Sequence, residues 1–282
     1  MRLPWRRTVP ASATSTEGPR LRDKLDVYTH EHVDDRTTLV CRSAASCRGS
    51  VGRATLVEGQ ASFVGSHYGL TQAGRELRIL VVPQQVGGAL AHGRDRGDEH
   101  VTVGERAAQV ETSKYGQRPY PRTAHMVGTE HALQVLLGMA ADGDPEIDVT
   151  GGRVHVFEAM AMANATLCSR VLSDAAGQGS ATMIKNCERH LKRTAELLRP
   201  NVILAQGYGK SGPSPSRAVA SMLGLGLPQK TSLTIAPAAW GEVAFVAATH
   251  PSRNWAAHTS AKWRELEPVL RATRAHVLGA HG

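Results

Sequence analysis

Polar side chains with the chemistry to act on a pyrimidine base are found after three short apolar runs of the sequence. In chain order these residues are Gln84, Gln85, Asn164 and His250. The amide of an asparagine can bond to both a carbonyl oxygen and the adjacent ring nitrogen, and a histidine can stabilise an oxygen that becomes negative as a base leaves. A single Asn or His at such a place is commonly a cap or turn residue. As a set, the four side chains predict a pyrimidine-binding site.

Four apolar runs must position these side chains. They span residues 78–82, 154–157, 202–205 and 243–248, and their length and composition predict buried strands. Helical patterns lie at residues 129–141, 184–198 and 259–277. Alternating strands and helices predict a three-layer α/β/α domain with a central, mostly parallel four-stranded sheet. Ligands of such sheets bind beyond the carboxyl ends of the strands, where the polar side chains should converge.

The chain is expected to form one domain, at residues 37–282, after a basic, flexible tail at residues 1–36. The first 22 residues contain a single acid, Glu17, which fits either a tail or a transit peptide. We favour the tail because the segment has no apolar helical face. No run of the sequence has the length and apolar character of a membrane span. We expect a cytoplasmic monomer that does not bind membranes.

The net charge of +8 and the pI of about 9.6 favour a polyanionic partner such as DNA. Clustered Lys and Arg side chains gain affinity for phosphates by releasing counterions. Basic residues gather in a long polar insertion at residues 89–122 and in a Gly/Ser/Pro loop at residues 207–216 that carries Lys210. Each segment is either an ordinary solvated excursion or an arm whose cations meet phosphates.

The four cysteines fall into two pairs that are far apart in the sequence. They are Cys41 and Cys47, then Cys168 and Cys187. A four-thiolate metal site needs two such local pairs, although the first pair is spaced more loosely than in most metal knuckles. Four free or buried thiols in a reducing compartment are the alternative.

With these landmarks in order, the sequence resembles the uracil-DNA glycosylase superfamily, and most closely its family 4, bacterial and archaeal enzymes with an iron–sulfur cluster. The matching segments are Cys41 with Cys47, residues 84–87, Asn164 with Cys168, Cys187 with residues 200–203, and residues 250–252. In the family these positions correspond to a C-x2-C pair, Gly-Glu-Ala-Pro-Gly, Thr-Asn-Val-Val-Lys-Cys, a cysteine and Pro-x-Val-Ile, and His-Pro-Ser. The resemblance covers the chain from about residue 41 to residue 270.

The resemblance implies a fold, a reaction and a cofactor. The reaction is hydrolysis of the N-glycosidic bond of a nucleotide that has swung out of the DNA helix, which leaves an abasic site. His250 would stabilise the departing base, and Asn164 would bind its edge. The four cysteines would hold a four-iron, four-sulfur cluster with a structural role, and zinc is the alternative metal.

Two departures from the family pattern bear on substrate. Gln84 and Gln85 replace the family's water-positioning letters, and glutamine can orient a water molecule but cannot act as a base. Met126 stands where the family has an aromatic residue that stacks on the base, so the base pocket formed with Asn164 and His250 is expected to be wider. The substrate is therefore either uracil or a bulkier modified pyrimidine, such as the glucosylated hydroxymethylcytosine of phage DNA, which would serve defence instead of repair.

The segment after His250 is expected to contact DNA. Ser252 and Arg253 would hold phosphate, and Trp255 would either wedge into the gap left by the extruded base or pack under the final helix. A catalytically silent module that binds single-stranded DNA is the alternative function on this fold. A generic nucleotide-binding protein is disfavoured, because no Gly-rich phosphate-binding motif follows the first strand.

Overall fold

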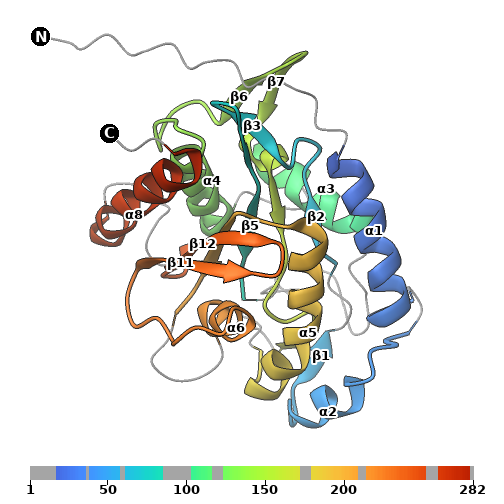
Figure 1. Ribbon diagram of the computed structural model, residues 1–282. Helices are drawn as coiled ribbons and strands as arrows, with labels where there is room; N and C mark the ends of the chain where they lie inside the picture. Colours follow the sequence, from blue (N-terminus) through green and yellow to red (C-terminus); the bar gives the residue numbers. More distant parts are fainter. Residues whose placement is uncertain are drawn as a thin grey trace, which may run out of the picture.

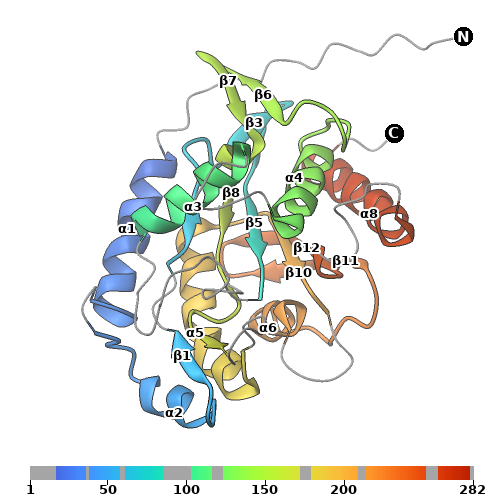
Figure 2. The same ribbon diagram turned by 180° about the vertical axis from the view of Figure 1, so that it is seen from behind.

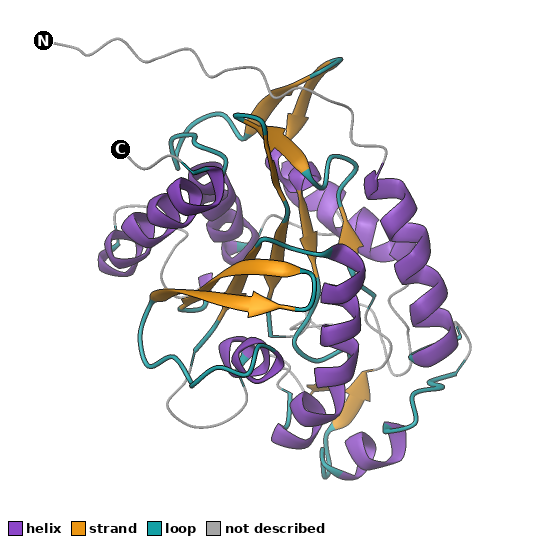
Figure 3. Cartoon of the chain, viewed as in Figure 1, coloured by secondary structure: helices purple, strands orange, loops and turns teal. Residues whose placement is uncertain are grey.

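The computed structural model of the chain describes eight segments, drawn as coloured ribbons in Figure 1. They are residues 17–35, 38–57, 61–84, 103–115, 123–171, 179–208, 214–251 and 260–279. Their architecture is mixed α/β, with a six-stranded sheet at the centre and helices packed against it (Figure 3). The expected α/β class with a mostly parallel sheet is therefore confirmed.

The central sheet has a parallel core of four strands and an antiparallel strand at each edge. Its order is β11 (Ser232–Ala238), β12 (Gly241–Ala248), β10 (Val202–Gln206), β5 (Ile79–Val82), β8 (Met160–Met162) and β2 (Phe63–Val64). The strands β12, β10, β5 and β8 run parallel, whereas β11 and β2 pair antiparallel with their neighbours. The prediction of four strands omitted these two edge strands.

One of the four predicted strands is misplaced. The run at residues 154–157 ends the small hairpin of β6 (Glu146–Val149) and β7 (Gly152–His155) and continues into the 3-10 turn η2 (Val156–Ala159). The backbone NH of Phe157 donates to the His155 side chain and so caps this turn. The true strand is β8, whose Met-Ala-Met sequence has no β-branched residue. A short apolar run therefore predicted the wrong segment, because periodicity does not separate a strand from a buried turn at this length.

The two faces of the sheet are buried under different helices (Figure 2). Along β10, Val202 and Leu204 pack with α4 (Ala124–Leu136) and α8 (Ala261–Leu278), and the alternate residues Ile203 and Ala205 pack on the other face. The helices of that second face are α1 (Glu17–His32), α5 (Ala181–Leu198) and α6 (Pro215–Met222). No helix within the described ranges is long and apolar enough to cross a membrane.

The helix α4 begins and ends earlier than the predicted helix at residues 129–141. The side chain of Thr123 caps its first turn by accepting a hydrogen bond from the backbone of Met126, at 3.3 Å. Gly138, just beyond the last turn, has a φ of +83°, a conformation that stops the helix. The early start brings Met126 into the first turn of α4, next to the sheet.

The domain begins before residue 37. Most of the predicted flexible tail that the structure describes is the helix α1, which buries Leu21 and Leu25 against the second face of the sheet. The side chain of Arg22 donates to the carbonyl oxygen of Val64 in the edge strand β2, at 2.6 and 3.2 Å. Gly18 allows this close approach, because a β-carbon there would lie 2.4 Å from the backbone oxygen of Gly65. Residues 1–16 of the predicted tail lie outside the described segments.

The remaining elements extend the domain at its margins. They are α2 (Ala44–Gly49), α3 (Val103–Tyr115), the hairpin of β3 (Leu70–Gln72) and β4 (Arg75–Leu77), and the antiparallel pair of β1 (Thr55–Val57) and β9 (Ser169–Val171). The pairing of β1 with β9 ties the segment that contains the first two cysteines to the segment that follows β8.

Candidate functional site

The carboxyl ends of the four parallel strands meet at one edge of the sheet. Because β12, β10, β5 and β8 are neighbours, the residues that follow them are brought together in that order. The ladder continues past the last residues of β5 and β8, since Ala163 donates to Val81 and Ala165 donates to Pro83, at 3.0 and 2.8 Å. We call Asn164, Gln206 and His250, which stand at the ends of β8, β10 and β12, the edge row.

Asn164 is buried beside the carboxyl end of β8, with 4% of its surface exposed. Met162 packs in the hydrophobic core between the sheet and α4, whereas Ala163 packs in the core on the opposite face of the sheet. Because the extended ladder runs on to Ala165, this alternation places Asn164 on the same face as α4. The expected base-binding amide therefore lies at the edge of the sheet, under α4.

His250 lies on the same face, two residues after the end of β12. Its ring stacks at a tilt against the ring of His125 in the first turn of α4, with the ring centroids 5.2 Å apart and the planes at 40°. Met126, the next residue of that turn, is half-buried against the hydrophobic core between the sheet and α4. The three expected members of the base pocket, Asn164, Met126 and His250, therefore come from elements that border one face of the sheet. His125 is an additional side chain there that the sequence reasoning did not identify.

Gln206, the last residue of β10, is a second side chain that the sequence reasoning missed. It is fully buried, and its Nε2 donates to the Thr129 hydroxyl on α4, at 2.8 Å. In the order of the strands it lies between Asn164 and His250. The signal was present in the sequence, because Gln206 follows an apolar run just as the other site residues do.

Gln84 is held through its backbone. The carbonyl oxygen of Gln84 accepts hydrogen bonds from the backbone NH and the hydroxyl of Thr166, at 3.1 and 3.3 Å. Its side chain is half-buried. The segment that carries Asn164 thus also fixes the turn after β5. The other predicted site residues, Gln85, Lys210, Ser252, Arg253 and Trp255, lie outside the described segments.

The four cysteines gather in one corner of the molecule, where α2 and β1 lie beside the first half of α5 (Figures 1 and 2). Cys47 and Cys168 are buried in one small apolar cluster that also contains Met183. Cys187 accepts a hydrogen bond from the backbone NH of Leu167, the neighbour of Cys168, at 3.4 Å. All four thiols are free of disulfides. The two pairs that are distant in sequence are therefore close in space.

The environment of these thiols combines burial with donors to sulfur. Burial raises the pKa of the Cys187 thiol to about 12, and it also raises the pKa of Cys47. The Asn186 amide donates to the sulfur of Cys47 at 3.3 Å, and the Arg189 guanidinium donates to the sulfur of Cys41 at 3.2 Å. Such donors favour thiolate over thiol and are found around iron–sulfur ligands.

A metal site is not assembled in this corner as the chain stands. Among the residues that the structure describes, no group of three or more His, Cys, Asp or Glu side chains is arranged to hold a metal ion. One further donor does lie close by, since the Nε2 of His190 is 3.5 Å from the sulfur of Cys41. The Nδ1 atom of His190 is hydrogen-bonded to the Tyr28 hydroxyl at 2.8 Å, which couples α1 to this corner. The side chains of this corner that could ligate a metal are thus the four thiols and the imidazole of His190.

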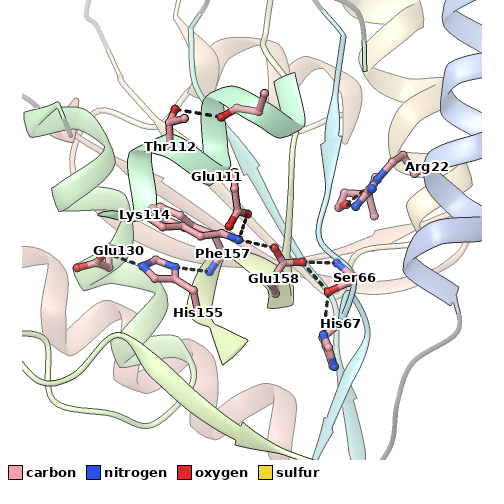
Figure 4. A network of polar contacts seen from close by, with 12 residues as sticks. Arg22, Ser66, His67, Glu111, Thr112, Lys114, Glu130, His155, Phe157 and Glu158 are labelled. Atoms are coloured by element: carbon pink, nitrogen blue, oxygen red, sulfur yellow. Dashed lines mark hydrogen bonds and ion pairs between the residues drawn. The ribbon is translucent and has the colours of Figure 1, made fainter. Parts of the chain in front are cut away.

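A buried ionic network fixes the end of the basic insertion (Figure 4). The ammonium group of Lys114, in α3, is 2.7 Å from a carboxylate oxygen of Glu158 in η2, and it also pairs with Glu111. The second carboxylate oxygen of Glu158 accepts from the backbone and hydroxyl of Ser66, at 2.7 and 2.6 Å. Burial alone would raise the pKa of Glu158, but the bonds from Lys114 and Ser66 outweigh it and hold the pKa at about 2.

This network removes Lys114 from the cations of the insertion that could contact phosphates. Lys114 is buried, with 5% of its side chain exposed, so it is not available to a phosphate. The second buried pair in the same region, His155 with Glu130 of α4 at 3.1 Å, also joins a helix to the segment before β8. Because the Nδ1 atom of His155 accepts from the backbone of Phe157, the proton of a neutral ring is on Nε2 and is donated to Glu130. Each of the two pairs stabilises the packing of a helix against the segment that precedes β8.

No family model matches the chain, and no curated protein matches it.

Proposed function

We propose that this chain is a DNA glycosylase that hydrolyses the N-glycosidic bond of a pyrimidine nucleotide swung out of the DNA helix. The observation that carries the proposal is the edge row, in which Asn164, Gln206 and His250 lie at the carboxyl ends of three strands of the parallel core, β8, β10 and β12, on the face covered by α4. An amide for the base edge and an imidazole for the departing oxygen are the groups that this reaction needs. The overall arrangement is proposed to be the three-layer α/β/α fold of the uracil-DNA glycosylases.

In the proposed reaction, a water oxygen bonds to the sugar C1′ as the bond from C1′ to the base nitrogen breaks. The electron pair leaves with the base, which takes up the proton that water gives up. His250 donates a hydrogen bond to the base oxygen on which negative charge develops, and Asn164 binds the opposite edge. Gln84 and Gln85 orient the water but take no proton, so leaving-group stabilisation supplies most of the rate acceleration. Water is the only co-reactant.

The DNA strand would cross this edge of the sheet. Ser252 and Arg253, which follow His250 in sequence, and Lys210, in the loop after β10, are proposed to hold the backbone phosphates. Trp255 is proposed to fill the gap that the extruded base leaves. Lys114 is left out of this surface because of its ion pair with Glu158.

The four cysteines are proposed to hold a four-iron, four-sulfur cluster. A four-iron cluster takes one thiolate on each of its four irons, and zinc is the alternative metal for the same thiolates. Cys47 and Cys168 share one apolar cluster, and Cys187 accepts a hydrogen bond from the neighbour of Cys168. Bound there, the cluster would supply structural cohesion between α2, α5 and the segment after β8.

The substrate class is the part of the proposal that a panel of oligonucleotides tests. The purified protein is incubated with single- and double-stranded DNA that contains uracil, or glucosylated hydroxymethylcytosine, and abasic sites are cleaved with alkali. We expect abasic sites at one of these bases. Because Met126 replaces a stacking aromatic, we propose the bulkier base, and attack on modified DNA would indicate phage defence while attack on uracil would indicate repair.

The same panel distinguishes the competing function. Retention of DNA without abasic sites on any substrate would identify the chain as a silent single-strand-binding module and would refute the enzyme.

A further inference from the structure

The side-chain oxygen of Gln206, Oε1, has no hydrogen-bond partner in the described part of the chain. Gln206 is completely buried, its amide nitrogen donates to the Thr129 hydroxyl, and its Oε1 accepts no hydrogen bond from the residues that the structure describes. Buried polar atoms without a partner are rare, because the lost interaction with water is not replaced. In a chain proposed to bind a polar ligand at this place, such an atom marks a contact that the ligand supplies.

The orientation of the Gln206 amide follows from its neighbour. Thr129 donates its single hydroxyl proton to the backbone oxygen of His125, at 2.8 Å. Its oxygen therefore faces Gln206 as an acceptor, and only the NH2 group of the amide satisfies it. The hydrogen-bond pattern thus turns Oε1 away from Thr129 and prevents the amide from offering a donor instead.

The position of Gln206 links it to the edge row. It is the last residue of β10, and the next residue, Gly207, has a φ of +144° with a hypothetical β-carbon 3.1 Å from Pro215. The backbone NH of Gly207 still donates to the oxygen of Ala248 in β12, at 2.8 Å, and its positive φ allows the chain to leave the sheet from there. Neighbouring strands are about 4.8 Å apart, so the backbone of Gln206 is about 5 Å from that of β12 and about 10 Å from that of β8. A pyrimidine ring bound between Asn164 and His250 would pass this residue.

We propose that Oε1 of Gln206 accepts a hydrogen bond from an N–H group on the Watson–Crick edge of the extruded pyrimidine and so determines which base is bound. This inference rests on the proposed glycosylase function. Uracil offers N3–H, and cytosine-type bases offer the exocyclic amine; both are N–H donors, and the locked amide rejects an acceptor at that point. Because Gln206 is buried, a side chain that covers Oε1 must move as the base enters.

The test compares bases that keep or lose the N–H group. The probes are uracil and its N3-methyl derivative, and cytosine-type bases and their N4,N4-dimethyl derivatives, each in a 2′-fluoroarabino nucleotide that binds but resists cleavage. The wild-type protein should bind one N–H base at least tenfold more tightly than its methylated form. The pair that shows this preference identifies the donor as N3–H or as the exocyclic amine.

Substitutions then assign the preference to Gln206. In Gln206→Leu we expect affinity for the preferred base to fall by about 10- to 100-fold, with the preference over its methylated form lost. Thr129→Val, which frees the amide to rotate, should weaken the preference, and Thr129→Ser, which keeps the hydroxyl, should retain it. A thermal melt of each variant separates these effects from unfolding.

Two outcomes overturn different parts of the account. If the wild-type protein forms abasic sites but Gln206→Leu keeps the same preference between N–H and methylated bases, the role of Gln206 is only structural and the inference fails. If the wild-type protein forms no abasic site on any DNA, the proposed function fails, and this result is independent of Gln206.

Discussion

His250 is the residue on which the proposed chemistry depends most. It is half-buried at the end of β12, against the ring of His125. In His250→Ala, the developing charge on the base loses its hydrogen-bond donor, and we expect the single-turnover rate of abasic-site formation to fall by about 100- to 1,000-fold. The measurement is made on the base that the wild-type protein attacks.

The matched control is His125→Ala, which removes the neighbouring ring but leaves the donor in place. We expect its rate to fall by less than tenfold. If a correctly folded His250→Ala protein forms abasic sites at the wild-type rate, His250 takes no part in the reaction.

At the scale of residues, the sequence predicted that Asn164 and His250 follow strands, and both lie at the carboxyl edge of the sheet. His250 follows a strand that was predicted, β12, whereas Asn164 follows β8 and not the run at residues 154–157 from which it was predicted. Gln206 was not predicted, because a role in binding was assigned to the Gly/Ser/Pro loop after β10 and not to the last residue of the strand. His125 was missed because its contact with His250 depends on where α4 begins, and that in turn depends on Thr123 as the cap.

The buried network around Lys114 makes a prediction at the scale of elements. Folding lowers the pKa of Glu158 from its ordinary value of 4.5 to about 2, so the unfolded chain takes up this proton more readily. The resulting stability is fully present above about pH 4.5 and is lost as the pH falls towards 2. We expect it to contribute about 1–2 kcal/mol after allowance for solvent screening.

Glu158→Gln tests this contribution. It should lower the free energy of unfolding in urea by about 1–3 kcal/mol at pH 7 and flatten its decline between pH 5 and pH 2. Glu111→Gln is the matched control, since the side chain of Glu111 is 59% exposed and its loss should cost less than about 1 kcal/mol. Equal effects of the two substitutions would contradict the role of Glu158 as the anchor of α3.

The cysteine corner makes a second prediction about elements. If a four-iron cluster joins α2 to α5, anaerobically purified protein should be brown, with a broad absorption near 400 nm and about four irons and four sulfides per chain. Removal of the cluster by a chelator and an oxidant should expose α2 to proteolysis before the rest of the domain.

Cysteine substitutions give the control for this site. Cys187→Ser should lose the colour and most of the iron, whereas His190→Gln should keep both if the four thiolates alone are the ligands. A folded, colourless protein that contains one zinc ion would show that the site binds zinc instead of a cluster. A folded protein without any metal would refute the metal site.

The positions of the strands and helices were predicted less well than the residues that lie at the carboxyl edge of the sheet. The runs at residues 202–205 and 243–248 correspond to β10 and β12 because both are rich in apolar residues and buried on both faces. The strand β8 has only three residues, and β2 has two, so neither carries a detectable period. The helix α1 was assigned to a tail because its apolar contact is small, with Leu21 and Leu25 on an otherwise polar helix.

At the scale of the whole molecule, one segment joins the carboxyl edge of the sheet to the corner that contains the cysteines. Residues 163–168 follow β8, bring Asn164 to the edge row, bind the backbone of Gln84 and end at Cys168 in the corner. Through this segment, the proposed metal site would affect the geometry of the proposed base site. The proposed function follows from the resemblance of the sequence to the family 4 glycosylases, and the edge row is where it would act.

Hydrolysis of the N-glycosidic bond is the central claim, and product analysis in H2 18O tests it most directly. The protein is incubated in labelled water with the DNA that it attacks, and the products are separated and weighed by mass spectrometry. We predict a free pyrimidine base without the label and an abasic deoxyribose with one 18O atom at C1′. Release of no base, or a label found on the base instead of the sugar, would contradict the account.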